Sequence, residues 1–208
     1  SSLDDMIGRE ILEQPNPTVG LAAHHGEIDI RVTAKADNEA LADEMIQKTE
    51  QRIRERVGKY VYGVDADTLP EVLVALMQAN NYRLAIVQAG IDDVVTKMMH
   101  MAEHGAGVIA LSEVLAHPDD ARTAYEVAAN VPMREMAAII AQTACETAHA
   151  NAAIVVLSLP DVDEDADVSE ASVVHVYAAG HSRERVYGFG GRSDFARAWV
   201  TRWSLSNV

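Results

Sequence analysis

Apolar side chains follow two different spacings along the first third of the chain. Residues 1–14 carry them on one side of a helical pattern, and Pro15 ends this predicted helix because proline lacks an amide donor. Residues 18–23 and 28–34 are predicted strands. In the second strand every other residue is apolar, which is typical of a strand with one buried face.

A longer helix is expected after this pair of strands. Asp37 is a favourable N-cap, and Gly58 stands where a left-handed residue commonly ends a helix. Between them an inner stripe recurs at helical spacing: Leu41, Met45, Ile46, Thr49, Ile53 and Val57. Residues 60–62 are then predicted to form a last short strand. The segment therefore makes a small β-β-α-β unit.

The remaining two thirds of the chain mix strands and helices. Asp67 is expected to cap a helix that has Pro70 in its first turn and turns Leu73, Leu76 and Met77 inward. The further predicted elements are strand 84–87, helix 91–104, strand 107–111, helices 118–129 and 132–150, strands 152–157, 172–179 and 184–189, and helix 193–205. The predicted fold class is α/β: an α+β module followed by a three-layer α/β/α domain, whose mixed sheet has an antiparallel pair near its end.

The composition of the chain argues against nucleic acid and membranes as binding partners. The 208 residues are 49% hydrophobic and carry a net charge of −15, which disfavours nucleic acid because phosphate binding relies on Lys and Arg. No apolar stretch reaches the ~18–20 residues of a membrane-spanning helix, so no membrane partner is expected. Cys145 is the only cysteine and cannot form an internal disulfide, which favours the cytoplasm. Because the chain starts Ser1-Ser2, we expect a fragment of a longer protein.

Several short motifs follow one another in residues 16–63. They are Asn16-Pro17-Thr18-Val19, Gly26-Glu27, Arg31-Val32-Thr33-Ala34-Lys35-Ala36 and Gly58-Lys59-Tyr60-Val61-Tyr62-Gly63. This series resembles the linker domain of the competence/damage-inducible CinA family, a KH-like α+β module. The resemblance implies that residues 1–15 are the trailing helix of a preceding molybdopterin-binding-like domain, 16–66 the KH-like linker and 67–208 the CinA C-terminal-type α/β domain.

The resemblance also implies a chemistry that this sequence does not keep. In the family, the C-terminal domain hydrolyses the amide of nicotinamide mononucleotide with a serine nucleophile, a tyrosine and a lysine. Aligned on the first buried strand, these fall at Ala89, Leu111 and near Ala116. After Lys59 the only lysine is Lys97, in the middle of a predicted helix. We therefore predict no catalytic residues and no cofactor, but a pseudoenzyme that serves in oligomerisation or ligand binding.

Two alternatives stay open. The first is an active nicotinamide-nucleotide amidohydrolase, a deamidase with relocated catalytic residues, which requires polar side chains to converge in the old pocket. The candidates for that pocket are Gln88, Asp92, Asp93, Ser112, His175 and Arg192. The second is a sensor that binds a nucleotide without turnover. Since family members form dimers, the resemblance also implies a homodimer.

Two further patterns have the form of metal sites. His100-Met101-Ala102-Glu103-His104 matches H-x-x-E-H, whose spacing on a helix puts both imidazoles on one face, but no third ligand is evident. Residues 161–170 carry six carboxylates, yet Ala166 replaces the glycine that a calcium loop of the EF-hand type requires. We predict no metal site, and a solvated loop for the acidic stretch.

Overall fold

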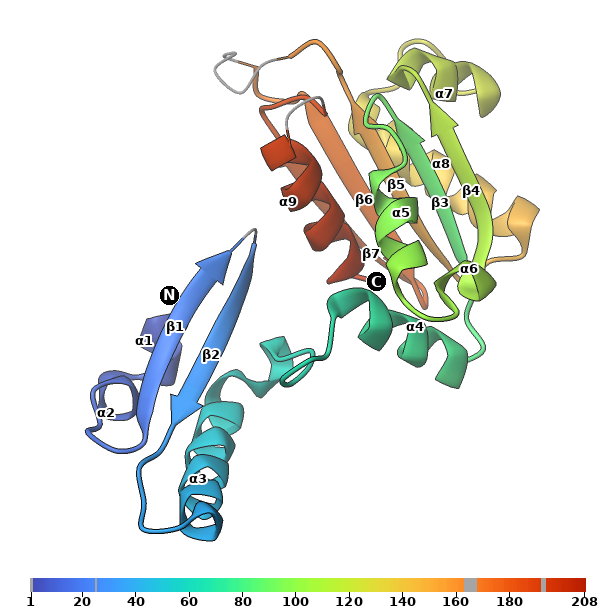
Figure 1. Cartoon of the computed structure of the whole chain (residues 1–208). Helices are drawn as coiled ribbons and strands as arrows, with labels where there is room; N and C mark the ends of the chain where they lie inside the picture. The colour runs from blue at the N-terminus through green and yellow to red at the C-terminus, as the bar shows by residue number, and fades with distance from the viewer. Residues whose placement is uncertain (1, 25, 163–167, 192–193) are drawn as a thin grey trace. The chain divides into compact units, whose positions relative to one another are not determined.

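The computed structural model describes residues 2–24, 26–162, 168–191 and 194–208 (Figure 1). The chain divides into two compact units, residues 1–64 and 65–208, and each has its own apolar core. The first unit is a small α+β module, and the second is a mixed sheet packed against helices. The predicted α/β fold class is therefore confirmed.

The first unit consists of two short helices, a hairpin and one long helix. Its elements are α1 (Leu3–Ile7), α2 (Arg9–Leu12), β1 (Thr18–His24), β2 (Glu27–Thr33), α3 (Glu39–Val57) and the 3-10 helix η1 (Gly58–Tyr60). The single helix expected over residues 1–14 is interrupted at Gly8, whose φ of 88° favours glycine. The two short helices still bury Ile7 and Ile11 in one cluster with Ile53 and Val57 of α3.

The hairpin and α3 agree with the sequence pattern in outline. β1 and β2 pair antiparallel along their whole length. Asn38 rather than Asp37 caps α3, because its side-chain oxygen accepts a hydrogen bond from the amide of Leu41 at 2.9 Å. Leu41 was expected in the inner stripe but is exposed, whereas Thr49, Ile53 and Val57 of the same stripe are buried. The apolar stripe therefore faces the core only where α1 and α2 provide a surface to pack against.

The end of this unit differs from the expectation. Gly58 keeps right-handed helical angles instead of left-handed ones, and the chain tightens there into η1. Residues 60–62 form no strand: Tyr60 and Tyr62 are exposed, while Val61 packs against the small core. A segment with strand-forming side chains becomes a strand only where a neighbouring strand pairs with it, which explains the wrong prediction.

The second unit is built around a sheet whose five described strands lie in the order β4-β3-β5-β6-β7 (Figure 1). β3, β4 and β5 are parallel, and β6 and β7 are antiparallel to their neighbours. The sheet is thus mixed and ends in an antiparallel pair, which was predicted. The strands are β3 (Leu84–Ala89), β4 (Ile109–Leu115), β5 (Ala152–Ser158), β6 (Ser172–Ala178) and β7 (His181–Tyr187). The helices are α4 (Leu69–Ala79), α5 (Val94–Met101), α6 (Gly105–Val108), α7 (Pro118–Ala124), α8 (Met133–Ala148) and α9 (Asp194–Leu205).

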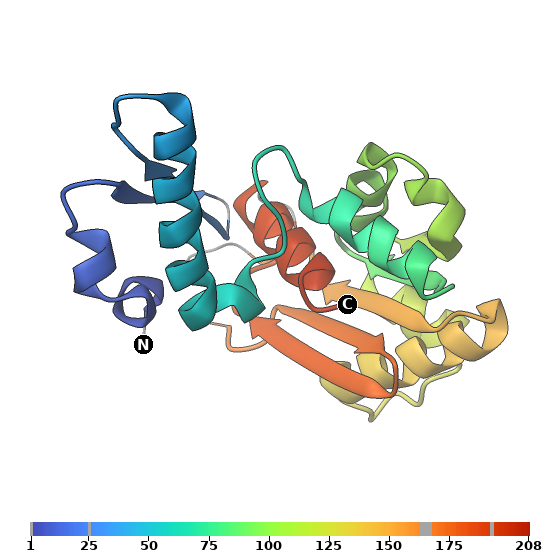
Figure 2. The ribbon, with the colours of Figure 1, turned by 90° about the horizontal axis from the view of Figure 1, so that it is seen from below.

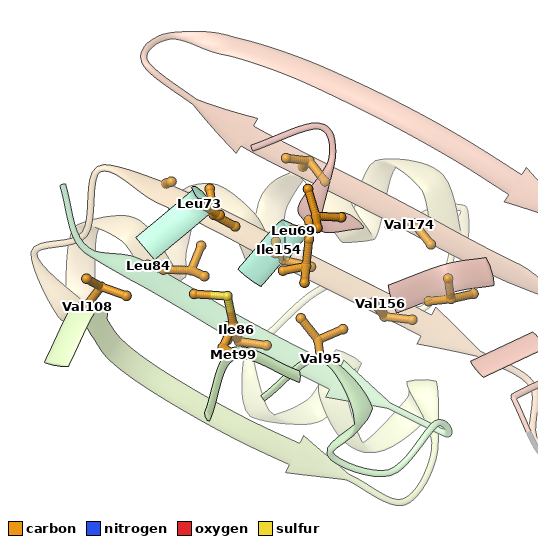
Figure 3. Packing of buried hydrophobic residues seen from close by; sticks show 14 of the residues in the cluster. Leu69, Leu73, Leu84, Ile86, Val95, Met99, Val108, Ile154, Val156 and Val174 are labelled. Atoms are coloured by element: carbon orange, nitrogen blue, oxygen red, sulfur yellow. The ribbon is translucent and has the colours of Figure 1, made fainter. Parts of the chain in front are cut away.

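Helices cover both faces of this sheet (Figure 2). α4, α5 and α9 pack on one face and α8 on the other, and each interface has its own apolar cluster. Figure 3 shows the first cluster, where Leu84 and Ile86 of β3 and Ile154 of β5 lie together with Met99 of α5. Because strand side chains alternate, Val87 belongs to the second cluster. The sheet is thus buried on both faces.

Two details at the start of the second unit differ from the sequence pattern. Thr68 rather than Asp67 begins α4, because its hydroxyl and its amide both donate to the carboxylate of Glu71. The Thr68 side chain in turn accepts from the backbone amide of Glu71, and this bond together with the one from the Thr68 amide to the Glu71 carboxylate makes a capping box. Leu76 was expected to point inward but is 57% exposed, so the buried stripe of α4 is narrower than the apolar pattern indicates.

The helix expected over 91–104 is shorter, and the strand after it starts later. α5 ends at Met101, and His104 adopts left-handed angles with a φ of 63°, so the chain turns back over the helix end. A Cβ on Gly105 would collide with the carbonyl oxygen of Met99, so this close return requires glycine. The short helix α6 then takes the place of the expected strand start.

Candidate functional site

The described residues form a cleft of about 580 Å³ at the carboxyl ends of β3 and β4. The chain leaves β3 toward α5 on one face of the sheet, and leaves β4 toward α7 and α8 on the other. Such a divergence opens a crevice beside the strand ends, which is the usual ligand site of open α/β sheets. The cleft is lined by Gly90, Ile91, Asp92, Val114, Leu115, Ala116, Pro160, Gly191 and Arg197.

The backbone is packed tightly around this cleft. Gly90 has a φ of 76° and donates its amide hydrogen to the carbonyl oxygen of Leu115 at 3.0 Å, which ties the ends of β3 and β4 together. A Cβ on Gly90 would collide with the carbonyl oxygen of Ser158, and one on Gly191 would lie 2.6 Å from the carbonyl oxygen of Gly90. Three chain segments therefore meet here at a distance that only glycine allows.

The positions at which a nucleophile, a tyrosine and a lysine were expected carry no reactive group. Ala89 is fully buried and belongs to the apolar cluster under α8, and Leu111 packs at the margin of the same cluster. Ala116 lines the cleft. Methyl and isobutyl side chains cannot attack a carbonyl or transfer a proton. Any chemistry at the cleft would have to come from other residues.

Among the described residues that line the cleft, Asp92 and Arg197 are charged, and they are paired with each other. Arg197 Nη2 lies 2.6 Å from Oδ2 of Asp92, and Arg197 Nε donates to the carbonyl oxygen of Gly191 at 3.1 Å. Asp92 has a φ of 46°, in the left-handed region that aspartate tolerates better than most residues. The next residue, Asp93, pairs with Lys97 at 2.7 Å, and this hydrogen bond is the main cause that lowers the pKa of Asp93.

A buried polar network links β3, α5 and β4 beside the cleft. Gln88 is fully buried, and its side-chain oxygen accepts from the amide of Val95 at 2.7 Å. Its side-chain nitrogen donates to the hydroxyl of Thr96 at 3.0 Å, and this hydroxyl lies 2.7 Å from that of Ser112. Both polar ends of Gln88 are thus satisfied within the protein. The glutamine holds the start of α5 in place.

His175 lies on the opposite face of the sheet from Gln88, since its neighbours along β6 face the cluster around α5 and α9. It is only 7% exposed, and its Nδ1 has no hydrogen-bond partner among the described residues. Burial lowers the pKa of His175, and the carboxylate of Glu184 opposes this effect. Arg134 of α8 donates to Glu184 at 2.6 Å. Arg192 lies outside the described residues.

The polar candidates from the sequence therefore do not gather at one place. Gln88 and Ser112 share the network of Thr96, Asp92 lines the cleft, and His175 is on the other face. Arg197, a cation that lines the cleft, was not among the residues predicted from the sequence. Its partner Asp92 is 105 positions away in the chain, so no local motif marks the pair.

The H-x-x-E-H pattern does not form one helical face, which corrects the expected geometry. His100 lies in the last turn of α5, but the helix ends at Met101 and His104 is beyond it. In the described part of the chain, no three His, Cys, Asp or Glu side chains are grouped so that they could hold a metal ion. The acidic stretch lies partly outside the described residues, at 163–167. Among the helices described, none has the length and hydropathy needed to cross a membrane.

Comparison with known proteins identifies the family. Residues 1–63 match the family model described as the damage-inducible protein CinA KH domain. A CinA-like protein of Kosmotoga olearia is 31% identical over 142 residues, which are 67% of this chain and 34% of that protein. The chain belongs to the CinA family. A CinA-like protein of Dictyoglomus thermophilum is 35% identical over 89 residues, or 43% of this chain and 22% of that protein.

The match to this CinA chain thus spans about a third of the length of the Kosmotoga protein and 22% of the length of the Dictyoglomus protein. Its C-terminal domain has the fold of solved CinA-superfamily proteins. One from Escherichia coli matches with a TM-score of 0.53 and 19% identity, over 72% of this chain and 93% of that one. One from Enterobacter cloacae matches with a TM-score of 0.56 and 14% identity, over 70% of this chain and 93% of that one. At sequence identities this low, the similarity to these structures shows a shared fold and nothing about activity.

Proposed function

We propose that the second unit of this CinA chain binds a small ligand in the cleft beside β3 and β4, and that it does not hydrolyse nicotinamide mononucleotide. The observation that carries the proposal is the chemistry of the lining. Among the described residues that line the cleft, there is no hydroxyl, thiol or amine side chain. The two ionisable groups, on Asp92 and Arg197, are engaged with each other.

A deamidase with relocated residues has less support. It requires Gln88, Ser112 and His175 to point to one reacting carbon, but the first two are tied into a network with Thr96, and His175 lies on the far face of the sheet. A general base must reach the proton it removes to within hydrogen-bond distance. The position of the cleft supports ligand binding, because such a crevice exists where strand connections diverge whether or not chemistry follows.

The amidohydrolase half of the proposal is tested by ammonia release. The purified chain is incubated with nicotinamide mononucleotide, and an active member of the family serves as the positive control. We expect no ammonia above the blank. Turnover would overturn the proposal, and Asp92→Asn would then show whether the carboxylate in the cleft carries the reaction.

The ligand half is tested by thermal unfolding in the presence of nucleotides. A ligand that binds only the folded chain raises the midpoint of unfolding, and more so at higher ligand concentration. We expect such a rise for at least one nucleotide, and its loss when Ala116 is replaced by Trp to fill the cleft. A panel without any effect would contradict ligand binding. The expected homodimer is a separate proposal, tested by sedimentation of the purified chain.

A further inference from the structure

Arg197 is held at the cleft by contacts from two distant segments. Its Nε donates to the carbonyl oxygen of Gly191, and its Nη2 donates to the carboxylate of Asp92. The first contact fixes the plane of the guanidinium group near the chain segment that follows β7. The second contact is with a side chain that comes directly after β3 and is 65% exposed. The guanidinium is therefore anchored on one side by backbone and on the other by an accessible carboxylate.

A guanidinium group has five N–H donors, and these two contacts use two of them. Arginine binds carboxylate and phosphate groups best when it can offer two parallel donors. Asp92 receives only one of them, from Nη2. Ion pairs this exposed contribute little to stability, so an incoming anion exchanges with the carboxylate of Asp92 at small cost.

We propose that the ligand of this cleft carries a phosphate or carboxylate group that takes the place of Asp92 on Arg197. This inference rests on the proposed function, since it names the ligand class of the same cleft. Asp92 then acts as a built-in competitor, because its carboxylate occupies the anion position whenever the ligand is absent. The measured affinity of the ligand is then the difference between the binding of its anionic group to Arg197 and the binding of the Asp92 carboxylate to the same side chain.

The neighbouring residue provides a matched control. Asp93 also carries a carboxylate paired with a cation, Lys97, at nearly the same distance. It stands at the start of α5 but is not among the residues that line the cleft. Neutralising Asp93 removes the same charge from the same turn of chain without freeing Arg197. The difference between variants at the two positions therefore separates direct competition from the general effect of net charge.

The experiment measures binding of three probes with related rings by isothermal titration at fixed ionic strength. Nicotinamide mononucleotide carries a phosphate, nicotinate a carboxylate, and nicotinamide neither. We expect Asp92→Asn to tighten binding of whichever anionic probe binds by about threefold to fivefold, the upper end of what an exposed ion pair contributes, and Asp93→Asn to change it by less than about twofold. Arg197→Gln is expected to weaken it by at least about tenfold, and nicotinamide is expected to respond to none of the variants.

The outcomes are distinguishable. If neither anionic probe binds the wild-type chain or Asp92→Asn, this inference fails, whereas the proposed function is decided by the nucleotide panel. If a probe binds but Asp92→Asn and Asp93→Asn behave alike, the cleft binds ligand without the exchange, and only the inference fails. Which anionic probe gains affinity decides between phosphate and carboxylate. Asparagine also tolerates left-handed angles at position 92, so the Asp92→Asn variant keeps the local backbone. Thermal unfolding of each variant checks that it is folded.

Discussion

His175 is unusual because one of its buried nitrogen atoms has no hydrogen-bond partner among the described residues. His175 is enclosed between β6 and α8, yet its Nδ1 finds no acceptor or donor among the described residues. Glu184 lies opposite it on β7, and Arg134 of α8 already engages that carboxylate. Burial therefore lowers the pKa of His175, and the carboxylate of Glu184 offsets this effect only in part.

This lowered pKa predicts a loss of stability in mild acid. A histidine in the unfolded chain takes up a proton near pH 6.5, while the folded chain does so only at lower pH. The unfolded state then binds more protons, so stability is complete above about pH 6.5 and falls below it. We expect His175→Phe to reduce the difference between urea midpoints at pH 7 and pH 5. An exposed control, His181→Phe, is expected to leave that difference unchanged, and an equal reduction in both would refute the assignment to His175.

At the level of elements, α5 depends on a residue that is not part of it. The first amides of a helix lack partners within the helix and are usually capped by the preceding residues. Here Gln88, on the adjacent strand, accepts from the amide of Val95, and the side chain of the N-cap residue Asp93 makes no such bond. The strand and the helix that follows it are thus joined by a polar contact as well as by the apolar cluster.

Replacing Gln88 by methionine tests this contact. The change keeps the length of the side chain but leaves the buried amide of Val95 without its partner and removes one of the two partners of the Thr96 hydroxyl, which keeps Ser112. We expect the free energy of unfolding of the second unit to fall by about 1–3 kcal/mol. Ser112→Ala, at the exposed end of the same network, is expected to cost less than about 0.5 kcal/mol because water replaces the hydroxyl. Urea unfolding measures both, and equal losses would contradict the role of Gln88.

Elements whose burial is complete were predictable from the sequence. The run over 152–157 is apolar throughout and becomes the central strand β5, and 84–87 becomes β3. Predictions failed where a distant segment decides the conformation. Residues 60–62 have strand-forming side chains without a strand beside them, and α5 ends early because Gly105 returns to contact Met99. No local pattern contains either contact.

The same reason limits what the sequence revealed of the site. Ala89, Leu111 and Ala116 could be named in advance, because the resemblance located the positions at which the family keeps reactive groups. The pairing of Asp92 with Arg197 and the separation of Gln88 from His175 depend on how strands are ordered and which face each side chain takes. Strand order is set by long-range packing, so only the three-dimensional structure supplies it.

On the scale of the whole molecule, the two units have separate cores of unequal size. The first unit buries a small apolar cluster around Ile53 and Val57, whereas the second has two larger clusters on the faces of its sheet. A domain of about 60 residues buries a smaller share of its surface than a larger one and is correspondingly less stable. We therefore expect two unfolding transitions, the first unit unfolding at the lower temperature.

A pair of matched substitutions tests this independence. Ile53→Ala removes a buried side chain from the first unit and is expected to cost about 2–5 kcal/mol there, which unfolds it or moves its transition far down. The second transition is expected to stay where it was. Ile140→Ala makes the equivalent change under the sheet of the second unit and is expected to shift only the upper transition. Calorimetry of both variants checks this, and a joint shift would mean that the units unfold together.

The glycines around the cleft have a consequence for directed evolution. Gly90 and Gly191 hold three chain segments so close together that any side chain at either position would force the strand ends apart. A library meant to change what the cleft accepts should keep both codons fixed. Diversity belongs instead at Val114 and Ala116, which line the same space on β4 and just after it and carry no part of that contact.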